Sequence, residues 1–240
     1  IGYEARSRVF TLKGMKIKAP TAADTWVLKS TNVIQWLSAG AGSPVDIYYA
    51  ANGVSFDTTR PIAANRANVN GLNSNVWALE TFRSPSTNAR IKVQSALESA
   101  ISEPFRVHGI RVTAPVNTDI WAMDETNRIA WQAIGTVGNF TLELIKDGGA
   151  PELIVAGVTT NYFDWVVPSN AISSNAVIRV TDGGGYVGDS LAFQVVGEPT
   201  IALVDPAPGD YWRVSDTMQI AWSKGGKMVG AEVLMRWQHA

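Results

Sequence analysis

The stretch Asp119-Ile120-Trp121, with a second tryptophan ten residues later at Trp131, decides the fold of this chain. The arrangement occurs twice more, as Asp24/Trp26/Trp36 and as Asp210/Trp212/Trp222. All three copies fit the pattern Pro-x3-Asp-x-Trp-x4-Thr-x2-Ile-x-Trp. Since tryptophan is an uncommon residue, three matches at one fixed spacing indicate an internal repeat.

The repeat divides the chain into segments of domain size. Gly14, Gly109 and Gly197 begin the successive copies, and segments of about this length can each bury a core. We predict a last strand of a preceding repeat at 1–13, full repeats at 14–108 and 109–196, and the first part of a truncated repeat at 197–240. We therefore expect an interior piece of a longer repetitive protein.

Both full repeats consist of short runs with alternating apolar residues. In the first repeat the runs are Met15–Lys18, Val33–Trp36, Val45–Tyr49, Val76–Leu79, Ile91–Val93 and Phe105–Val107, with a polar stretch over 50–75. In the second repeat they are Ile110–Val112, Ile129–Trp131, Leu142–Leu144, Leu153–Val155, Phe163–Val167, Ile178–Val180 and Leu191–Val195. No segment keeps a helical period, so the pattern predicts an all-β protein of tandem immunoglobulin/fibronectin-like β-sandwich domains. A barrel fits the same period but is rarer as a tandem unit of this size.

The ends of the chain predict further strands. Val9–Lys13 alternates, with Phe10 and Leu12 expected to face inward. In the truncated repeat, Ile201–Leu203, Ile220–Trp222 and Val233–Trp237 are the expected strands. A half-sandwich of this kind exposes its core face and needs a partner.

Composition excludes several classes of function. A formal net charge of −1 gives no basic field for nucleic acid or for an anionic membrane surface. No stretch is long and apolar enough to span a bilayer. The chain has no cysteine, so it has no disulfides, thiol chemistry or cysteine-ligated zinc. For an extracellular domain of this size, the lack of cysteine favours a microbial surface protein.

The two tryptophans of each pair have different expected roles. The second one, at Trp36, Trp131 and Trp222, alternates with an isoleucine on a strand and should fill the core. The first one, at Trp26, Trp121 and Trp212, follows a turn, where it either plugs the end of the sandwich or stands exposed as a platform for sugar stacking. We expect plugging, because a sugar site seldom recurs identically in every copy. The preceding aspartates, Asp24, Asp119 and Asp210, are interpreted as turn formers whose carboxylates accept backbone N–H groups.

The run Asp182-Gly183-Gly184-Gly185, together with Asp189, is a candidate calcium loop, because calcium requires several oxygen ligands on a flexible turn. The first repeat lacks both aspartates and the glycines at the corresponding place, Gln94–Glu98. A plain hairpin connection is the preferred interpretation.

Catalytic chemistry finds little support in the sequence. The two histidines, His108 and His239, belong to no nucleophile or metal motif, and no pair of carboxylates recurs at a fixed spacing. Asn139-Phe140-Thr141 matches an N-glycosylation sequon.

Several of these motifs together resemble a known family. Besides the paired tryptophans, they are Phe163-x-Trp165-x2-Pro168, Ile178-Arg179-Val180-Thr181-Asp182 and Ser190-x2-Phe193. The order is similar to the Ig-like repeat of the Kre9/Knh1 type, which occurs in fungal cell-wall proteins and in tandem in large bacterial and archaeal surface proteins. The likeness covers the whole second repeat, while the first departs at Leu79-Glu80-Thr81 and the third matches only over its opening.

The resemblance implies a non-enzymatic structural protein of the cell surface or cell wall, outside the cell. Its tandem β-sandwiches would build an S-layer, a sheath, a fibre or the stalk of an adhesin. The expected partners are copies of the chain itself or neighbouring surface-protein domains, and we expect no nucleic acid, no membrane insertion and no cofactor other than the candidate calcium ion. The alternatives are a carbohydrate-binding module for cell-wall polysaccharide and an accessory region of a secreted hydrolase.

Overall fold

A computed structural model describes residues 3, 4, 6, 8, 9, 11–136, 138–213 and 215–227 of the chain. The chain forms two compact units. The first consists of 1–111 together with the segments 132–138 and 182–188, and the second contains the remaining residues. No helix among the described residues has the length and apolar character needed to cross a membrane.

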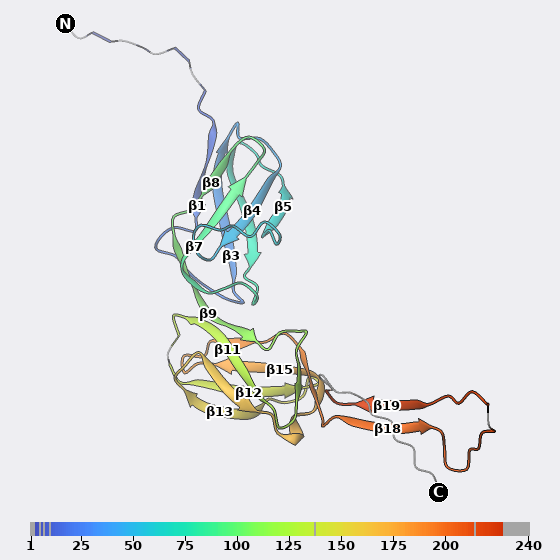
Figure 1. Ribbon diagram of the computed structural model, residues 1–240. Helices are drawn as coiled ribbons and strands as arrows, with labels where there is room; N and C mark the ends of the chain where they lie inside the picture. The colour runs from blue at the N-terminus through green and yellow to red at the C-terminus, as the bar shows by residue number, and fades with distance from the viewer. Residues whose placement is uncertain are drawn as a thin grey trace. The chain divides into compact units, whose positions relative to one another are not determined.

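The described residues of the first repeat form strands and no helix (Figure 1). They are β1 (Gly14–Ala19), β2 (Thr25–Val27), β3 (Thr31–Ala39), β4 (Val45–Ala50), β5 (Ala63–Arg66), β6 (Gly71–Ala78), β7 (Ser86–Gln94), β8 (Ser99–Ile101) and β9 (Phe105–Ala114). One sheet has the order β1-β3-β6. In the other, β9-β7-β4-β5 lie side by side, β2 pairs with β9 in parallel, and β8 pairs with β7.

The second repeat has the same plan. Its strands are the end of β9, then β10 (Ile120–Ala122), β11 (Thr126–Ile134), β12 (Phe140–Lys146), β13 (Glu152–Val158), β14 (Tyr162–Val166), β15 (Ser173–Thr181), β16 (Val187–Asp189) and β17 (Phe193–Val196). A single 3-10 turn, η1 (Ser169–Ala171), precedes β15. One group of strands has the order β14-β11-β9, and the other has the order β10-β17-β15-β12-β13, with β10 parallel to β17.

The strand order establishes the fold class. A three-stranded sheet faces a larger sheet, and a short strand near the start of each repeat crosses over to pair in parallel with the last strand. Antiparallel sheets of this connectivity define an immunoglobulin-like sandwich. The prediction of tandem all-β sandwiches is therefore confirmed, and the barrel alternative is wrong.

Strand β9 belongs to both repeats. Phe105 and Val107 pair with β7, and the end of the strand adjoins β11. Gly109 lies in its middle with φ of 132°, and a side chain there would meet Leu28 at 3.0 Å, so glycine is required at this position. The predicted boundary between 108 and 109 lies inside this strand, and the boundaries of the repeats stay a prediction.

Alternation along each strand places one side in the core between the two sheets. In β3, Ile34 and Trp36 are buried while Val33 and Leu37 point outward. In β11 the buried pair is Ile129 and Trp131. The predicted core role of the second tryptophan is thus confirmed in both full repeats.

The serine of the Ser-x2-Phe motif connects the last two long strands of each sandwich. The Ser102 hydroxyl accepts the amide N–H of Ile91 at 3.0 Å, and the Ser190 hydroxyl accepts that of Ile178 at 2.9 Å. Each hydroxyl donates in turn to the carbonyl of the next residue. The motif recurs because a buried amide near the last strand needs this acceptor.

Two expectations differ from the structure. The polar stretch 50–75 contains β5 and the start of β6, because cross-strand pairing with β4 and β3 overrides the weak apolar pattern. The described residues of 1–13 form no strand, and Leu12, expected to face inward, is exposed. Phe10 lies outside the described residues, and the assignment of 1–13 to a preceding repeat stays a prediction.

The third copy forms only a hairpin within the described residues. It pairs β18 (Thr200–Asp205) with β19 (Ala221–Gly225), which confirms two of the three strands expected there. Trp222, predicted to fill a core, is 45% exposed, because the two strands face no second sheet in the described part of the chain. The third expected strand, Val233–Trp237, lies outside the described residues.

Candidate functional site

The aspartates before the first tryptophans are turn formers in all three copies. Asp24 accepts the backbone N–H of Thr21 at 2.6 Å, Asp119 that of Val116 at 2.8 Å, and Asp210 that of Ala207 at 2.6 Å. The three carboxylates make the same bond in the same turn, as the sequence predicted. None of the three contributes to a metal-ligand cluster within the described residues.

The first tryptophan plugs the sandwich in both complete repeats. Trp26 is 8% exposed and packs edge-on against Phe105, with the ring centroids 4.9 Å apart. Trp121 is 5% exposed and packs against Phe193 at 4.8 Å. Burial leaves neither ring a free face, so the structure removes both from the candidates for sugar stacking.

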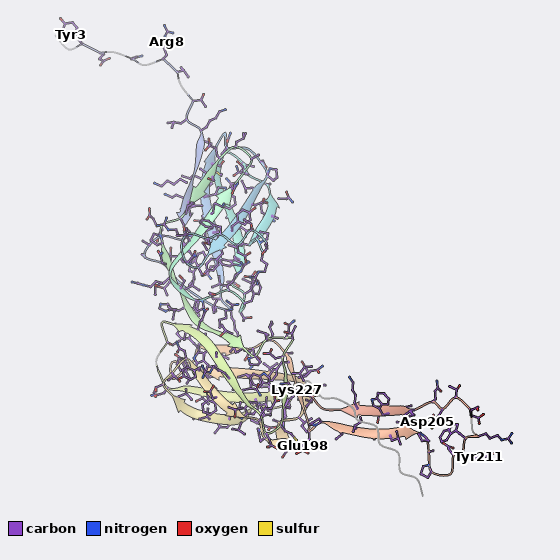
Figure 2. The ribbon with its side chains drawn as sticks, viewed as in Figure 1. Tyr3, Arg8, Glu198, Asp205, Tyr211 and Lys227 are labelled. Carbon is purple, nitrogen blue, oxygen red and sulfur yellow. The ribbon has the colours of Figure 1, made fainter. Side chains whose placement is uncertain are left out.

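Trp212 differs from its counterparts, since it is 39% exposed. In the complete repeats the last strand supplies the phenylalanine that covers this tryptophan, and the described part of the third copy contains no such strand. The connection between β18 and β19 also carries Tyr211, which is labelled at the end of the hairpin in Figure 2. Sugar stacking at Trp212 stays a prediction.

Asp182 and Asp189, the candidate calcium ligands, are engaged in other interactions. Asp182 is buried, and its Oδ1 accepts the backbone N–H groups of Gly184 at 3.1 Å and Tyr186 at 2.7 Å. Asp189 pairs with Arg179 at 2.8 Å, which raises the pKa of the arginine. The described residues contain no group of three or more His, Cys, Asp or Glu side chains that could hold a metal ion. A calcium ion at this loop stays a prediction without a built site.

Ser95 performs the role of Asp182 in the first repeat. Its hydroxyl accepts the backbone N–H groups of Leu97 at 3.1 Å and Glu98 at 3.0 Å. A neutral serine therefore supports the same hairpin connection that the buried aspartate supports. This equivalence favours the turn interpretation of Asp182.

The sequon residue Asn139 is exposed and adopts φ of 74°, at the bend that leads into β12. Its side chain is accessible, as a glycosylation acceptor must be. Modification at Asn139 stays a prediction.

The first unit also contains a pocket of about 240 Å³ that sequence reasoning missed. Its lining residues come from the connection between β4 and β5, from the segment after β6, and from the strands β4 and β9. They are Tyr49, Ala51, Asn52, Ser55, Asp57, Arg60, Phe82, Arg83, Ser84 and Arg111. The available signal was the Asn- and Arg-rich stretch over 50–75, which has no counterpart in the second repeat.

Arg83 occupies the centre of the polar network around this pocket and is only 4% exposed. Its guanidinium donates to Asp57 at 3.3 Å, to Glu80 at 3.2 Å and to the carbonyl oxygen of Arg60 at 2.7 Å. The guanidinium also lies 4.8 Å from the centre of the Phe82 ring. Ion pairs and hydrogen bonds thus compensate the burial of this charge.

Asp57 organises the loop below the network. One carboxylate oxygen accepts the amide N–H groups of Thr59 and Arg60 and the Thr59 hydroxyl, and the other accepts both arginines, Arg60 at 3.1 Å and Arg83 at 3.3 Å. The hydrogen bond from the Thr59 hydroxyl is the largest cause that lowers the pKa of Asp57. The carboxylate is saturated with donors and remains charged well below neutral pH.

Burial has the opposite effect on the nearby tyrosine. Tyr49 is buried and donates its hydroxyl to the carbonyl oxygen of Ser84 at 2.9 Å. Burial raises its pKa above the ordinary value. A neutral Tyr49 therefore anchors the segment after β6 to the floor of the pocket.

Comparisons with known proteins assign the chain to no family. No protein-family model matches it, and the comparison with curated proteins found no match. Among solved structures, the fibronectin(III)-like modules of CbhA from Clostridium thermocellum align at 15% identity over 75% of this chain and 92% of theirs, with a TM-score of 0.26. Extracellular domains 3–5 of Drosophila OTK align at 14% identity over 80% of this chain and 70% of theirs, with a TM-score of 0.34. Because both scores are low, the fold assignment rests on the strand order.

Proposed function

We propose that this chain is a structural, non-enzymatic part of an extracellular surface protein, in which tandem Ig-like sandwiches build an assembly or a stalk. The observation that carries the proposal is the use of the recurring polar residues. Asp24 and Asp119 support turns, and Ser102 and Ser190 support strands, by the same bonds in each repeat. The polar residues that recur in the sequence are those that hold turns and strands together. This pattern is typical of a spacer or assembly module.

The resemblance to repeats of the Kre9/Knh1 type supports the same role. Such repeats occur in tandem at microbial surfaces, and the two complete sandwiches here share strand β9 with no linker between them. We propose that the partners are further copies of the chain or neighbouring domains of the same surface protein.

A carbohydrate-binding role through the tryptophans has less support. Two of the three candidate platforms, Trp26 and Trp121, are buried. Only the exposed Trp212 retains a surface for stacking. The further alternative, an accessory region of a secreted hydrolase, requires a catalytic domain outside the 240 residues.

Immunogold electron microscopy of the native full-length protein tests the proposal. Antibodies raised against residues 1–240 should label the outer surface of intact cells in an ordered lattice, along filaments or on projecting threads. Antibody that has been pre-adsorbed with the same chain is the control. The labelling should be repeated in a calcium chelator, because loss of order there would give the Asp182 loop a role.

Labelling confined to the cell interior would refute the proposal. Labelling of a soluble secreted complex with glycoside hydrolase activity would also refute it and would support the hydrolase alternative.

A further inference from the structure

The connection between β4 and β5 in the first repeat is longer than the sandwich requires. It covers 51–62, whereas the equivalent connection between β12 and β13 in the second repeat covers only 147–151. The short version closes the same pair of strands with an Asp-Gly-Gly turn. Closing this pair of strands therefore does not by itself require the extra residues of the first repeat.

The extra residues form a fixed structure. Asn52 accepts the N–H groups of Val54 and Ser55 at 3.0 and 2.7 Å, and Asp57 holds Arg60. The backbone of Asp57 is also bonded to the carbonyl oxygen of Tyr49 at 3.0 Å. A connection held at so many points is preorganised and loses little entropy when a ligand binds.

Three arginines and one aspartate line the pocket that this connection forms. Asp57 is shared by Arg60 and Arg83, Glu80 also pairs with Arg83, and no carboxylate among the described residues pairs with Arg111, so the three arginines face only two carboxylates. Burial, and then the positive charge of Arg60, lower the pKa of Arg111. The pocket therefore carries an excess of positive charge that an anion would neutralise.

The guanidinium groups also retain free donors. A guanidinium has five N–H groups, and Arg83 uses three of them in the bonds described above. Arg111 makes one bond, to the Ser84 hydroxyl at 2.7 Å. Arg83 is nearly buried, whereas Arg111 is partly exposed and four of its N–H groups have no acceptor among the described residues. Planar guanidinium groups bind oxyanions such as carboxylates well.

The size and the other lining residues narrow the class of ligand. The volume of about 240 Å³ is below the roughly 300–1,000 Å³ of sites for drug-sized molecules, so one small unit fits. Asn52, Ser55 and Ser84 present amide and hydroxyl groups, and Phe82 presents apolar surface. This lining matches a sugar ring with one anionic group. The anionic group would contact the arginines, and the ring and its hydroxyl groups would contact the apolar and polar side chains.

We propose that the pocket of the first repeat binds the carboxylate or sulfate group of an acidic sugar unit, with Arg111 and Arg60 as the main contacts. This inference goes beyond the structural role and does not depend on it.

Amide NMR of the chain 1–240 tests the inference, with sodium glucuronate, glucose 6-sulfate, glucose and inorganic sulfate titrated at constant ionic strength. Binding of either anionic sugar, with a dissociation constant on the order of 1 mM, should shift the amide signals of Asn52, Ser55 and Arg83. Glucose should leave these signals unchanged, and inorganic sulfate should bind at least about fivefold more weakly, since it lacks the ring. The anionic sugar that binds more tightly identifies the preferred group.

Substitutions locate the site. Arg111→Gln should weaken binding of the anionic sugar by about tenfold or more, since a charged hydrogen-bond donor is lost. Arg60→Gln, at a largely exposed side chain, should weaken binding in the same direction without affecting the fold. The matched control is Arg106→Gln, an exposed arginine on the same strand β9 as Arg111, which should bind like the parent chain. Near-ultraviolet circular dichroism confirms the fold of each variant.

Three results would overturn the inference. They are unchanged amide signals around the pocket at about 50 mM of both anionic sugars, equal binding of glucose, and inorganic sulfate binding as tightly as the sugars. Unchanged affinity in a folded Arg111→Gln variant would also reject it.

Discussion

Asp24, Asp119 and Asp210 each accept a backbone N–H three residues earlier in the chain, which explains why an aspartate recurs at one position. A recurring aspartate beside a tryptophan could also be interpreted as part of a ligand-binding site. Here its carboxylate replaces a missing backbone partner in a tight turn. At the scale of single residues, the recurring positions are therefore explained by local hydrogen bonding.

The two core tryptophans provide a matched pair for a prediction. The indole N–H of Trp36 donates to the Asn68 side chain at 2.8 Å, whereas the indole N–H of Trp131 is buried with no acceptor among the described residues. Trp36→Phe leaves an acceptor unpaired, while Trp131→Phe removes an unpaired donor. We expect Trp36→Phe to lower the free energy of unfolding by about 1 kcal/mol more than Trp131→Phe.

Urea denaturation followed by amide NMR signals measures this difference separately in each unit. Both substitutions also lose buried apolar surface, so each should destabilise its own unit. A larger loss of unfolding free energy for Trp131→Phe than for Trp36→Phe would contradict the role given to the indole N–H.

At the scale of elements, strands and connections follow different rules. The strands β1 to β9 of the first repeat and β9 to β17 of the second repeat are paired in the same order. In each repeat the alternating apolar residues of the two sheets must enclose a core between them. The connections between strands differ. The connection 51–62 lines a charged pocket, whereas the second repeat has only a short turn at the corresponding place.

The connection 51–62 should make stability depend on pH. The folded state lowers the pKa of Asp57 below its unfolded value. Its contribution is therefore fully present above the unfolded pKa of about 4, and it is lost as the pH falls through the lower folded pKa. Asp57→Asn should cost roughly 1–3 kcal/mol at pH 7, and the gap from the parent chain should narrow below about pH 4. Urea denaturation between pH 7 and pH 2 measures both quantities.

Asp164→Asn is the control for this experiment. Asp164 also pairs with an arginine, Arg128, at 2.7 Å, but both side chains are largely exposed. Such an exposed pair contributes little to stability, because solvent screens the two charges. A gap for Asp57→Asn that stays constant from pH 7 to pH 2 would show that the carboxylate charge is unimportant.

At the scale of the whole molecule, the hairpin of β18 and β19 is the incomplete part of the described chain. Leu203 lies directly opposite Trp222, and Ile201 lies two residues away on the same face of the strand. All three side chains are exposed. An apolar face on a two-stranded sheet favours association with another β-element.

We therefore predict that the chain 1–240 self-associates as its concentration rises. Leu203→Lys should lower the fraction of dimer, because it places a charge in the apolar face. Ala202→Lys adds the same charge to the opposite face of the same strand and should leave the fraction of dimer unchanged. Light scattering coupled to size-exclusion chromatography measures the mass, and a parent chain that stays monomeric at every concentration would refute the prediction.

The sequence by itself determined the fold class, most of the longer strands of both full repeats, the buried tryptophans Trp36 and Trp131 and the turn role of the aspartates. Period-2 alternation and short-range turn chemistry are local properties, so they can be read from neighbouring residues. Repetition strengthened each local signal, since a pattern that recurs at fixed spacing is seldom accidental.

Only the tertiary structure decided what depends on residues distant in sequence. Trp26 and Trp121 are buried because Phe105 and Phe193 arrive on the last strand of each repeat. Trp222 is exposed because the described part of its hairpin faces no second sheet. The pocket requires Arg60, Arg83 and Arg111 to converge from the connection 51–62, the segment after β6 and strand β9, and no spacing in the sequence encodes that convergence. Alternation predicts which side a residue faces, and packing alone determines what lies opposite.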